Sequence, residues 1–330
     1  MATQAKGSKT KIIYDSETTF KTTRVSADAH VLPFVSESLR MSRNLIDSST
    51  IRGNRNPQSP VRGNQEVAGD ITIELDPYIG KMFYNALGTF TTSGTSPYSH
   101  TFKINDLPPG LTIEKQFTDM DTAEYFLYNG CKINSMRMSF KPEGFIETTF
   151  NIMGAAHTVS TSSFDATPTD YTTSSVGGQF DGFQAAILEG GSSLGTCTSL
   201  EFTLENNLDG SVYVINSTGT RYSLPDGLVK VSGTLTALFD SMTLYNKAVN
   251  NQETSIRITL TQGSGSGAAY NEKIDIFLDE VIFQPQAPVI SGPQGVMVEL
   301  PFVAYYKDDS DATALRLILW NTQTGQNIFE

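Results

Sequence analysis

Apolar and polar residues alternate with a period of two at many places along this chain. The clearest cases lie at residues 71–75, 136–140, 200–204, 256–260 and 315–319. Such alternation is typical of β-strands that have one buried and one exposed face. Clusters of Pro, Gly, Asn and Asp separate most of these runs, which indicates turns between strands. The sequence therefore predicts a mainly β fold.

One segment shows helical periodicity instead of alternation. Asp76 suits the position before a helix, and Pro77 suits its first turn. Gly88 is suited to end the helix. The apolar residues between them fall on one stripe: Tyr78, Ile79, Met82, Phe83, Ala86 and Leu87. We expect a helix that packs this stripe against a sheet, with Tyr78, Ile79, Met82 and Phe83 as the main contacts.

The order of these elements occurs twice. Residues 67–76 parallel residues 231–240, and in each copy the strand leads directly into an apolar stretch with a capping residue, the second at 241–249. A long loop, another strand and a final pair of strands separated by a Pro/Gly turn follow in both copies. We interpret this order as an internal duplication.

The length of 330 residues fits two domains, although a single large β domain would also fit. A Ser/Thr-rich stretch between the two copies has the composition of a linker. We therefore expect a first domain at residues 1–157, a linker at 158–178 and a second domain at 179–330. The polar N-terminus lacks the apolar core of a signal peptide, which favours folding in a cytoplasm.

The chain is acidic, with a formal net charge of −12. Proteins that grip nucleic acid usually carry the opposite sign, because phosphate contacts need Lys and Arg. An acidic surface can simply keep a protein soluble. It would also suit a wall past which DNA slides without adhering, and charge alone does not separate these interpretations. No apolar run is long enough for a membrane helix.

No motif predicts catalysis, a cofactor or a metal. The three histidines, His30, His100 and His157, are far apart in sequence, and the two cysteines, Cys131 and Cys197, are expected to be plain buried residues. The Gly-rich segment at 263–267 precedes a strand rather than a helix, so we expect a hairpin tip and not a dinucleotide site. The acidic clusters at 119–124 and 308–311 are expected to be solvated turns.

Residues 48–65 form a long polar segment with three arginines, Arg52, Arg55 and Arg62, in an otherwise acidic protein. Long segments of this kind are usually functional or disordered. One interpretation is a surface loop without a role. The other is a basic arm that contacts the acidic face of a neighbouring subunit.

Taken in order, several segments resemble the tail tube protein family of bacteriophages with long, flexible tails. The segments are residues 32–39, 51–52, 67–75, 99–102, 111–115, 130–135 and 150–154, with 205–208 and 231–237 in the second half. They cover most of the chain, although none is diagnostic alone. They contain packing and turn residues, so the resemblance concerns fold and assembly and carries no catalytic site.

The resemblance implies two tandem β-sandwich or barrel-like domains, each with a flanking helix. It also implies rings whose sheets join edge to edge and which stack through long loops, so residues 48–65 would be the inter-ring arm. With two domains in a chain, three chains would form a pseudo-hexameric ring; the alternative is a homohexamer whose second half is a decoration domain. The implied partners are other copies of the chain, tape measure protein and DNA in the lumen, and tail terminator and distal tail proteins at the ends. Membrane binding and specific DNA binding are not expected.

Two other classes of protein remain as alternatives. A β-rich adhesin or decoration module would need exposed aromatic clusters, and the chain has a single tryptophan, Trp320, in a strand-like stretch. A glycan-cleaving enzyme would need two opposed carboxylates, which no motif indicates among the 35 acidic residues. The sequence thus favours a structural virion protein that forms a conduit for DNA.

Overall fold

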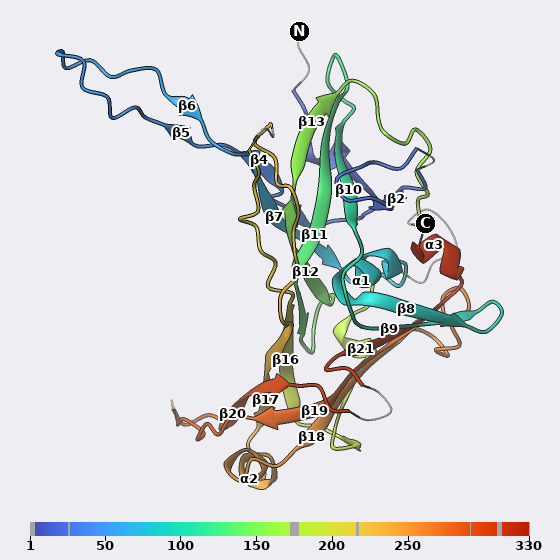
Figure 1. The fold of residues 1–330 in the computed structure, drawn as a ribbon. Helices are drawn as coiled ribbons and strands as arrows, with labels where there is room; N and C mark the ends of the chain where they lie inside the picture. Colours follow the sequence, from blue (N-terminus) through green and yellow to red (C-terminus); the bar gives the residue numbers. More distant parts are fainter. Residues whose placement is uncertain are drawn as a thin grey trace.

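The computed structural model describes residues 4–25, 27–171, 178–215, 218–290, 292–308 and 312–329. Most regular structure is antiparallel β, so the predicted mainly β class is confirmed (Figure 1). Among the described residues, nineteen strands join in one hydrogen-bonded network, and β5 pairs separately with β6. Figure 1 shows the strands of the two halves running in different directions, with the first half above the second.

In the first half of the chain, the described residues form thirteen strands, one α-helix and a short 3-10 helix. They are η1 (Gly7–Lys9), β1 (Lys11–Glu17), β2 (His30–Val31), β3 (Ser36–Glu37), β4 (Arg40–Ser42), β5 (Leu45–Ile46), β6 (Val61–Arg62), β7 (Glu66–Glu74), α1 (Gly80–Leu87), β8 (Gly88–Ser93), β9 (Tyr98–Ile104), β10 (Gly110–Phe117), β11 (Glu124–Phe140), β12 (Glu147–Gly154) and β13 (Ala156–Ser160).

The described part of the second half has fewer strands and two short α-helices. The elements are η2 (Gly182–Gln184), β14 (Ala185–Glu189), β15 (Ser192–Ser193), β16 (Cys197–Glu205), β17 (Lys230–Leu238), α2 (Thr243–Val249), β18 (Thr254–Thr261), β19 (Lys273–Phe283), β20 (Met297–Ala304), β21 (Arg316–Asn321) and α3 (Gly325–Phe329).

The two halves pair their strands in the same order. In the first half the order is β1, β10, β11, β12, β7 and then β3 with β4. In the second half it is β14, β18, β19, β20, β17 and then β16. β13 lies beside β11 as β21 lies beside β19, and a helix follows β7 as one follows β17. The internal repeat is therefore present in the topology; the domain boundaries stay a prediction.

Among the described strands, two ladders join the halves. The end of β11 pairs with β16 from Ser135 opposite Glu205 to Phe140 opposite Leu200. The β8–β9 hairpin of the first half adds to β21 of the second, with Phe102 opposite Leu317. This hairpin replaces the long loop that we expected after the first helix. The counterpart connection, between α2 and β18, is only residues 250–253.

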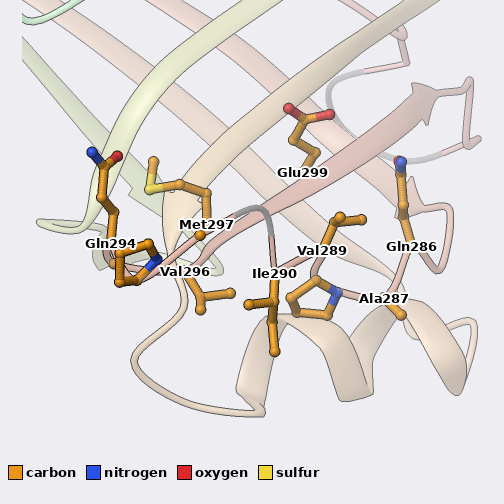
Figure 2. Close-up of a pocket in the computed structure, with 12 residues that line it drawn as sticks. Gln286, Ala287, Val289, Ile290, Gln294, Val296, Met297 and Glu299 are labelled. Carbon is orange, nitrogen blue, oxygen red and sulfur yellow. The ribbon is translucent and has the colours of Figure 1, made fainter.

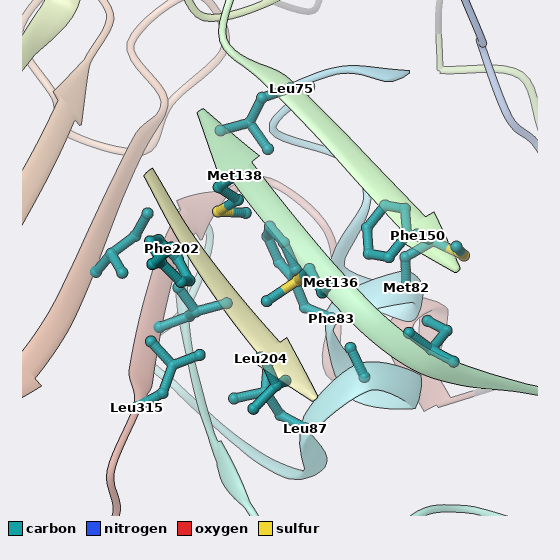
Figure 3. Close-up of a cluster of buried hydrophobic side chains, with 14 of the residues drawn as sticks. Leu75, Met82, Phe83, Leu87, Met136, Met138, Phe150, Phe202, Leu204 and Leu315 are labelled. Carbon is teal, nitrogen blue, oxygen red and sulfur yellow. The ribbon is translucent and has the colours of Figure 1, made fainter. Parts of the chain in front are cut away.

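The hydrophobic core runs through the β11–β16 junction. Figure 3 shows α1 side chains, among them Phe83 and Leu87, together with Met136 of β11 and with Phe202 and Leu204 of β16. All of these residues are buried. At about 25 cal/mol per Å² of buried apolar area, such a shared core strongly opposes separation of the two halves.

The predicted helix begins later than expected. It starts at Gly80 after Ile79, and no side chain caps it. Asp76 instead accepts a hydrogen bond from the Tyr78 N–H at 2.7 Å, which closes a turn of the kind Asp favours and holds residues 76–79 outside the helix. Gly88 ends the helix with φ 101°, as predicted. The residues of the apolar stripe are buried, but Lys81 and Asn85 are buried as well, so burial is not confined to that stripe.

The linker expected at residues 158–178 is described only up to residue 171 and again at 178. Its first residues are the end of β13. Farther on, the Ala29 N–H donates to Asp165 at 3.0 Å, and the Val31 N–H donates to the Thr169 carbonyl at 2.9 Å. The described part of this segment thus lies against the first half.

Candidate functional site: a polar sheet face

Six adjacent strands present one continuous polar face. In β7, β12, the end of β11, β16, β17 and β20, alternate residues are buried and the residues between them are at least partly exposed. The registers place these outward residues in rows across the strands. One row, with Asp70, Asn151, Ser135, Glu205 and Lys230, runs from β7 to β17. We call the outward residues of these six strands the polar face.

The polar face is acidic and contains many hydroxyl groups. Its members on the first four strands include Glu66, Asp70, Thr72, Glu74, Glu147, Thr149, Asn151, Ser135, Arg137, Ser139, Glu201, Thr203 and Glu205; β17 and β20 add Lys230, Ser232, Thr234, Thr236 and Glu299. These residues comprise seven carboxylates, Glu66, Asp70, Glu74, Glu147, Glu201, Glu205 and Glu299, and two cations, Arg137 and Lys230. An anionic polymer would be repelled rather than bound by such a surface.

Short-range pairing organises the charges within this face. Arg137 of β11 donates to Glu201 of β16 across the junction at 2.5 Å, and this carboxylate raises the pKa of Arg137. Lys230 lies 3.7 Å from Glu205. Asn151 donates to Asp70 at 2.7 Å, so the polar rows are hydrogen-bonded side to side. Both cations of the face are thus occupied by carboxylates of the same face.

Two glycines at equivalent places let the neighbouring strands approach. A Cβ on Gly69 would lie 2.5 Å from the Leu39 backbone, and one on Gly233 would lie 2.2 Å from the Glu201 carbonyl. Both distances are far below a real Cβ contact. The repeated Val-x-Gly sequence therefore has a physical reason: each copy brings another strand tightly against β7 or β17 at this point.

The predicted basic arm projects from the body as a hairpin (Figure 1). Its stem is β5 paired with β6, so residues 48–65 are not a loop throughout, and Arg62 lies in β6. Arg52, Arg55 and Arg62 are all exposed. The arm also exposes four aliphatic residues, Leu45, Ile46, Ile51 and Val61. The arginine pattern had indicated the arm, whereas its apolar content was missed.

The four helix residues expected to pack on a sheet are buried. Ile79, Met82 and Phe83 belong to the main core, and the ring of Tyr78 stacks on Tyr171 with centroids 5.0 Å apart. Tyr78 also donates to Glu272 at 3.2 Å, and burial raises the pKa of Tyr78 to about 12. Lys81, which the sequence did not single out, forms a buried ion pair with Asp15 at 2.8 Å.

The three histidines lie in separate places. His30 is buried beside Tyr14, and burial, followed by Lys81, lowers its pKa to about 3. His100 hydrogen-bonds to Asn321 at 3.1 Å within the core. His157 packs on Tyr128, and burial lowers its pKa. In the described ranges, no group of three or more His, Cys, Asp or Glu side chains is placed to hold a metal ion.

The remaining sequence candidates fall as follows. Cys131 is buried and Cys197 is half-buried, both are free thiols, and burial raises the pKa of each, that of Cys197 to about 11. The glycine-rich segment connects β18 to β19, as expected. Of the cluster at 308–311, residues 309–311 are outside the described residues. Within the described chain, no helix is long and apolar enough to cross a membrane.

Fold and polar face together define a β protein in which two sets of strands with one topology share an uninterrupted sheet. A model of the phage tail tube protein family matches residues 7–304, most of the chain, and the chain therefore belongs to that family. No curated protein matches it. The resemblance seen in the sequence is thus confirmed. The protein is a structural component of a phage tail, where members of the family self-assemble into the tube.

Proposed function

We propose that three copies of this chain form a pseudo-hexameric ring and that stacked rings form the tube through which DNA leaves the virion. The observation that supports three rather than six copies is the repeated strand order within one chain, joined by β11 and β16. Three chains supply six sheets of one topology, and a closed ring leaves no unpaired sheet edge. A homohexamer with the second half as decoration would leave that repeat without a role.

The polar face would line the lumen. Its carboxylates would repel the DNA backbone, and its Ser and Thr side chains offer no aromatic surface on which bases could stack. A reconstruction of the tube by electron cryomicroscopy would test this, with Asp70 and Glu201 expected at the inner wall. A neutral or basic inner wall built from other strands would exclude it. If the polar face does line the lumen, DNA and tape measure protein would occupy the lumen without a specific binding site.

The hairpin arm would reach the next ring. Its exposed aliphatic residues and its arginines suit a contact that buries apolar area and also pairs charge with an acidic neighbour. Tail terminator and distal tail proteins would take the place of this neighbour at the two ends of the tube. Assembly would take place in the cytoplasm of the host.

Removal of residues 51–62 tests the arm. Because all the deleted residues but Gln58 are exposed, we expect an unchanged β circular dichroism spectrum and unchanged unfolding but no polymerisation. A second variant, with Arg52, Arg55 and Arg62 all changed to Gln, keeps the aliphatic contacts and should polymerise weakly. Normal tubes from the deletion variant would remove the arm from ring stacking.

Negative-stain microscopy of the purified protein tests the function itself. Rings or hollow tubes support the conduit, whereas persistent monomers at high concentration favour the adhesin or decoration module. The mass of one ring then decides the stoichiometry. At 36.0 kDa per chain, a ring of three and a ring of six differ twofold in mass, and a ring of six chains would exclude the trimer.

A further inference from the structure

In the second half, one segment is equivalent to the part of β11 that pairs with β16. Among the described residues, this segment has no strand beside it. Lys132 of β11 pairs with Met153 of β12, and Ile282 of β19 pairs with Val303 of β20. Each residue of the second pair has a number 150 higher than the equivalent residue of the first pair. The stretch of β11 that pairs with β16 is 135–140. β11 shifts register by one residue between Ile133 and Ser135; with the same shift after Phe283, the counterpart is 285–290, which follows β19 after Gln284.

This counterpart has no strand beside it within the chain. Gln284 donates its backbone N–H to the Pro301 carbonyl at 2.7 Å, the last pairing of that strand with β20. Across the described residues, no backbone hydrogen bond links 285–290 to another strand. Pro285 and Pro288 lack an N–H, so a strand beside this segment would form fewer backbone hydrogen bonds with it than β16 forms with β11.

An apolar surface surrounds the segment. Val289 is 74% exposed and Ile290 is 79% exposed. They line a concave surface with Val296 and Met297, and Figure 2 shows these residues above a helix, which is α2 by its colour. Leu238 and Met242, which flank α2 in the chain, are also about half exposed, at 47% and 49%. Contiguous exposed apolar residues of this kind mark an interaction surface.

A matching edge lies at the other end of the molecule. β3 and β4 pair only with β7 among the described strands, so their outer side is an open edge. Met41 pairs with Val67 as Leu204 pairs with Val231, so β3–β4 corresponds to β16. The close approach of the backbone at Gly69 and Gly233 supports the same correspondence.

We propose that the β3–β4 edge of a second copy of this chain docks on residues 285–290, repeating the β11–β16 junction between chains. The register of that junction, Arg137 opposite Thr203 and Ser139 opposite Glu201, translates into Ala287 opposite Arg40 and Val289 opposite Ser38. The proposal rests on the proposed ring function and names the surfaces that close the ring. The contact is head to tail, so it closes only as a ring or continues as a filament.

The repetition is incomplete in one respect. Within a chain, the β8–β9 hairpin also crosses to β21. The second half has only residues 250–253 at the corresponding place, too few for such a hairpin. The contact between chains is therefore smaller than the one within a chain, which fits a protein that folds as single subunits before it assembles.

Paired cysteines test the register. In a Cys197→Ser background, Ser38→Cys with Val289→Cys, and Arg40→Cys with Ala287→Cys, should form disulfides between chains under mild oxidation of assembled protein. A non-reducing gel should show dimers and trimers. Ser38→Cys with Ala287→Cys is shifted by two residues, which places the Cα atoms beyond disulfide reach, and should cross-link at least tenfold less. Ser139→Cys with Glu201→Cys is the positive control, because it should close within one chain.

The outcomes separate this inference from the function. Rings seen by microscopy without cross-linking of either matched pair would overturn the docking proposal and leave the tube intact. Equal cross-linking of the shifted pair would also overturn the register. Monomers at every concentration, with the control pair closed, would overturn both the docking and the ring.

Discussion

The two helices that follow β7 and β17 occupy equivalent places and differ sharply in burial. Seven of the eight residues of α1 are buried, whereas Ala248 is the one buried residue of α2. The strands beneath them pair in the same order. The difference therefore comes from what lies on top of each helix.

Part of what covers α1 comes from the second half of the same chain. Phe202 and Leu204 of β16 reach it across the junction, and Ile328 of α3 packs against Gly80. Among the described residues, α2 has no comparable cover, because only Ala248 of this helix is buried. As in repeat proteins, each unit is completed by the next. The burial of α1 therefore indicates what the surface around α2 requires.

The largest expected difference between the helices concerns two lysines. Lys81 of α1 pairs with Asp15 of β1 at 2.8 Å, fully buried, and Lys247 of α2 pairs with Glu189 of β14 at 2.7 Å, partly exposed. Lys81→Met should cost about 3–5 kcal/mol of unfolding free energy, because it removes the near cation of the buried Asp15 and leaves that carboxylate only the cation of Arg24, at 3.8 Å. Lys247→Met should cost about 1–2 kcal/mol. Urea unfolding of both variants measures these losses of unfolding free energy. Equal losses would mean that the two lysines do not differ in the way their burial indicates.

A second pair compares packing without charge. Met82 of α1 is fully buried, and Met242 beside α2 is 49% exposed. Met82→Ala should lower the free energy of unfolding by about 2–5 kcal/mol through lost contacts and the cavity left behind. Met242→Ala should stay within about 0.5 kcal/mol of the parent in unassembled protein. Thermal unfolding of dilute samples checks both, and a large loss for Met242→Ala would mean that α2 is already covered.

The third pair uses pH. Asp76 and Asp240 end equivalent strands, but Asp76 is buried and Asp240 is exposed. Burial raises the pKa of Asp76 to about 6 from 3.8, so the folded state holds this proton more tightly and stability falls as pH rises through that range. Relative to the parent, Asp76→Asn should gain about 2–3 kcal/mol between pH 4 and pH 7. Asp240→Asn should show no such gain in the free energy of unfolding. If the difference in unfolding free energy between Asp76→Asn and the parent did not change with pH, the pKa of Asp76 would not be raised in the folded state.

Sequence alone predicted the elements whose signal is local. Alternation at residues 71–75, 200–204 and 256–260 marked strands correctly, because which residues are buried follows directly from the two faces of a strand. The Gly88 end of the helix was also readable, since it depends on one backbone conformation.

What the sequence did not reveal depends on contacts between distant residues. The sequence did not single out Lys81, because its burial beside Asp15 depends on the approach of β1. The pairing of β11 with β16 follows no local pattern, because both strands alternate in the same way as many others. The polar face was suggested by net charge, but its extent appears only once the strands are in register.

The smallest expected effect on folding sharpens the comparison most. Phe140 and Ile290 occupy equivalent positions; Phe140 is buried against β16, and Ile290 is 79% exposed. Ile290→Asp should leave unfolding of the single chain within about 0.5 kcal/mol, because the side chain is in solvent. It should raise the concentration needed for assembly at least tenfold, because a charge would have to enter the contact with the next chain.

Ile215→Asp is the control, because it changes another exposed isoleucine, 94% accessible. It should alter neither the unfolding of the single chain nor the concentration needed for assembly. Sedimentation across a concentration series measures both variants. Assembly of Ile290→Asp at the parent concentration would mean that no second copy covers α2, and the two helices would then differ for a reason confined to the single chain.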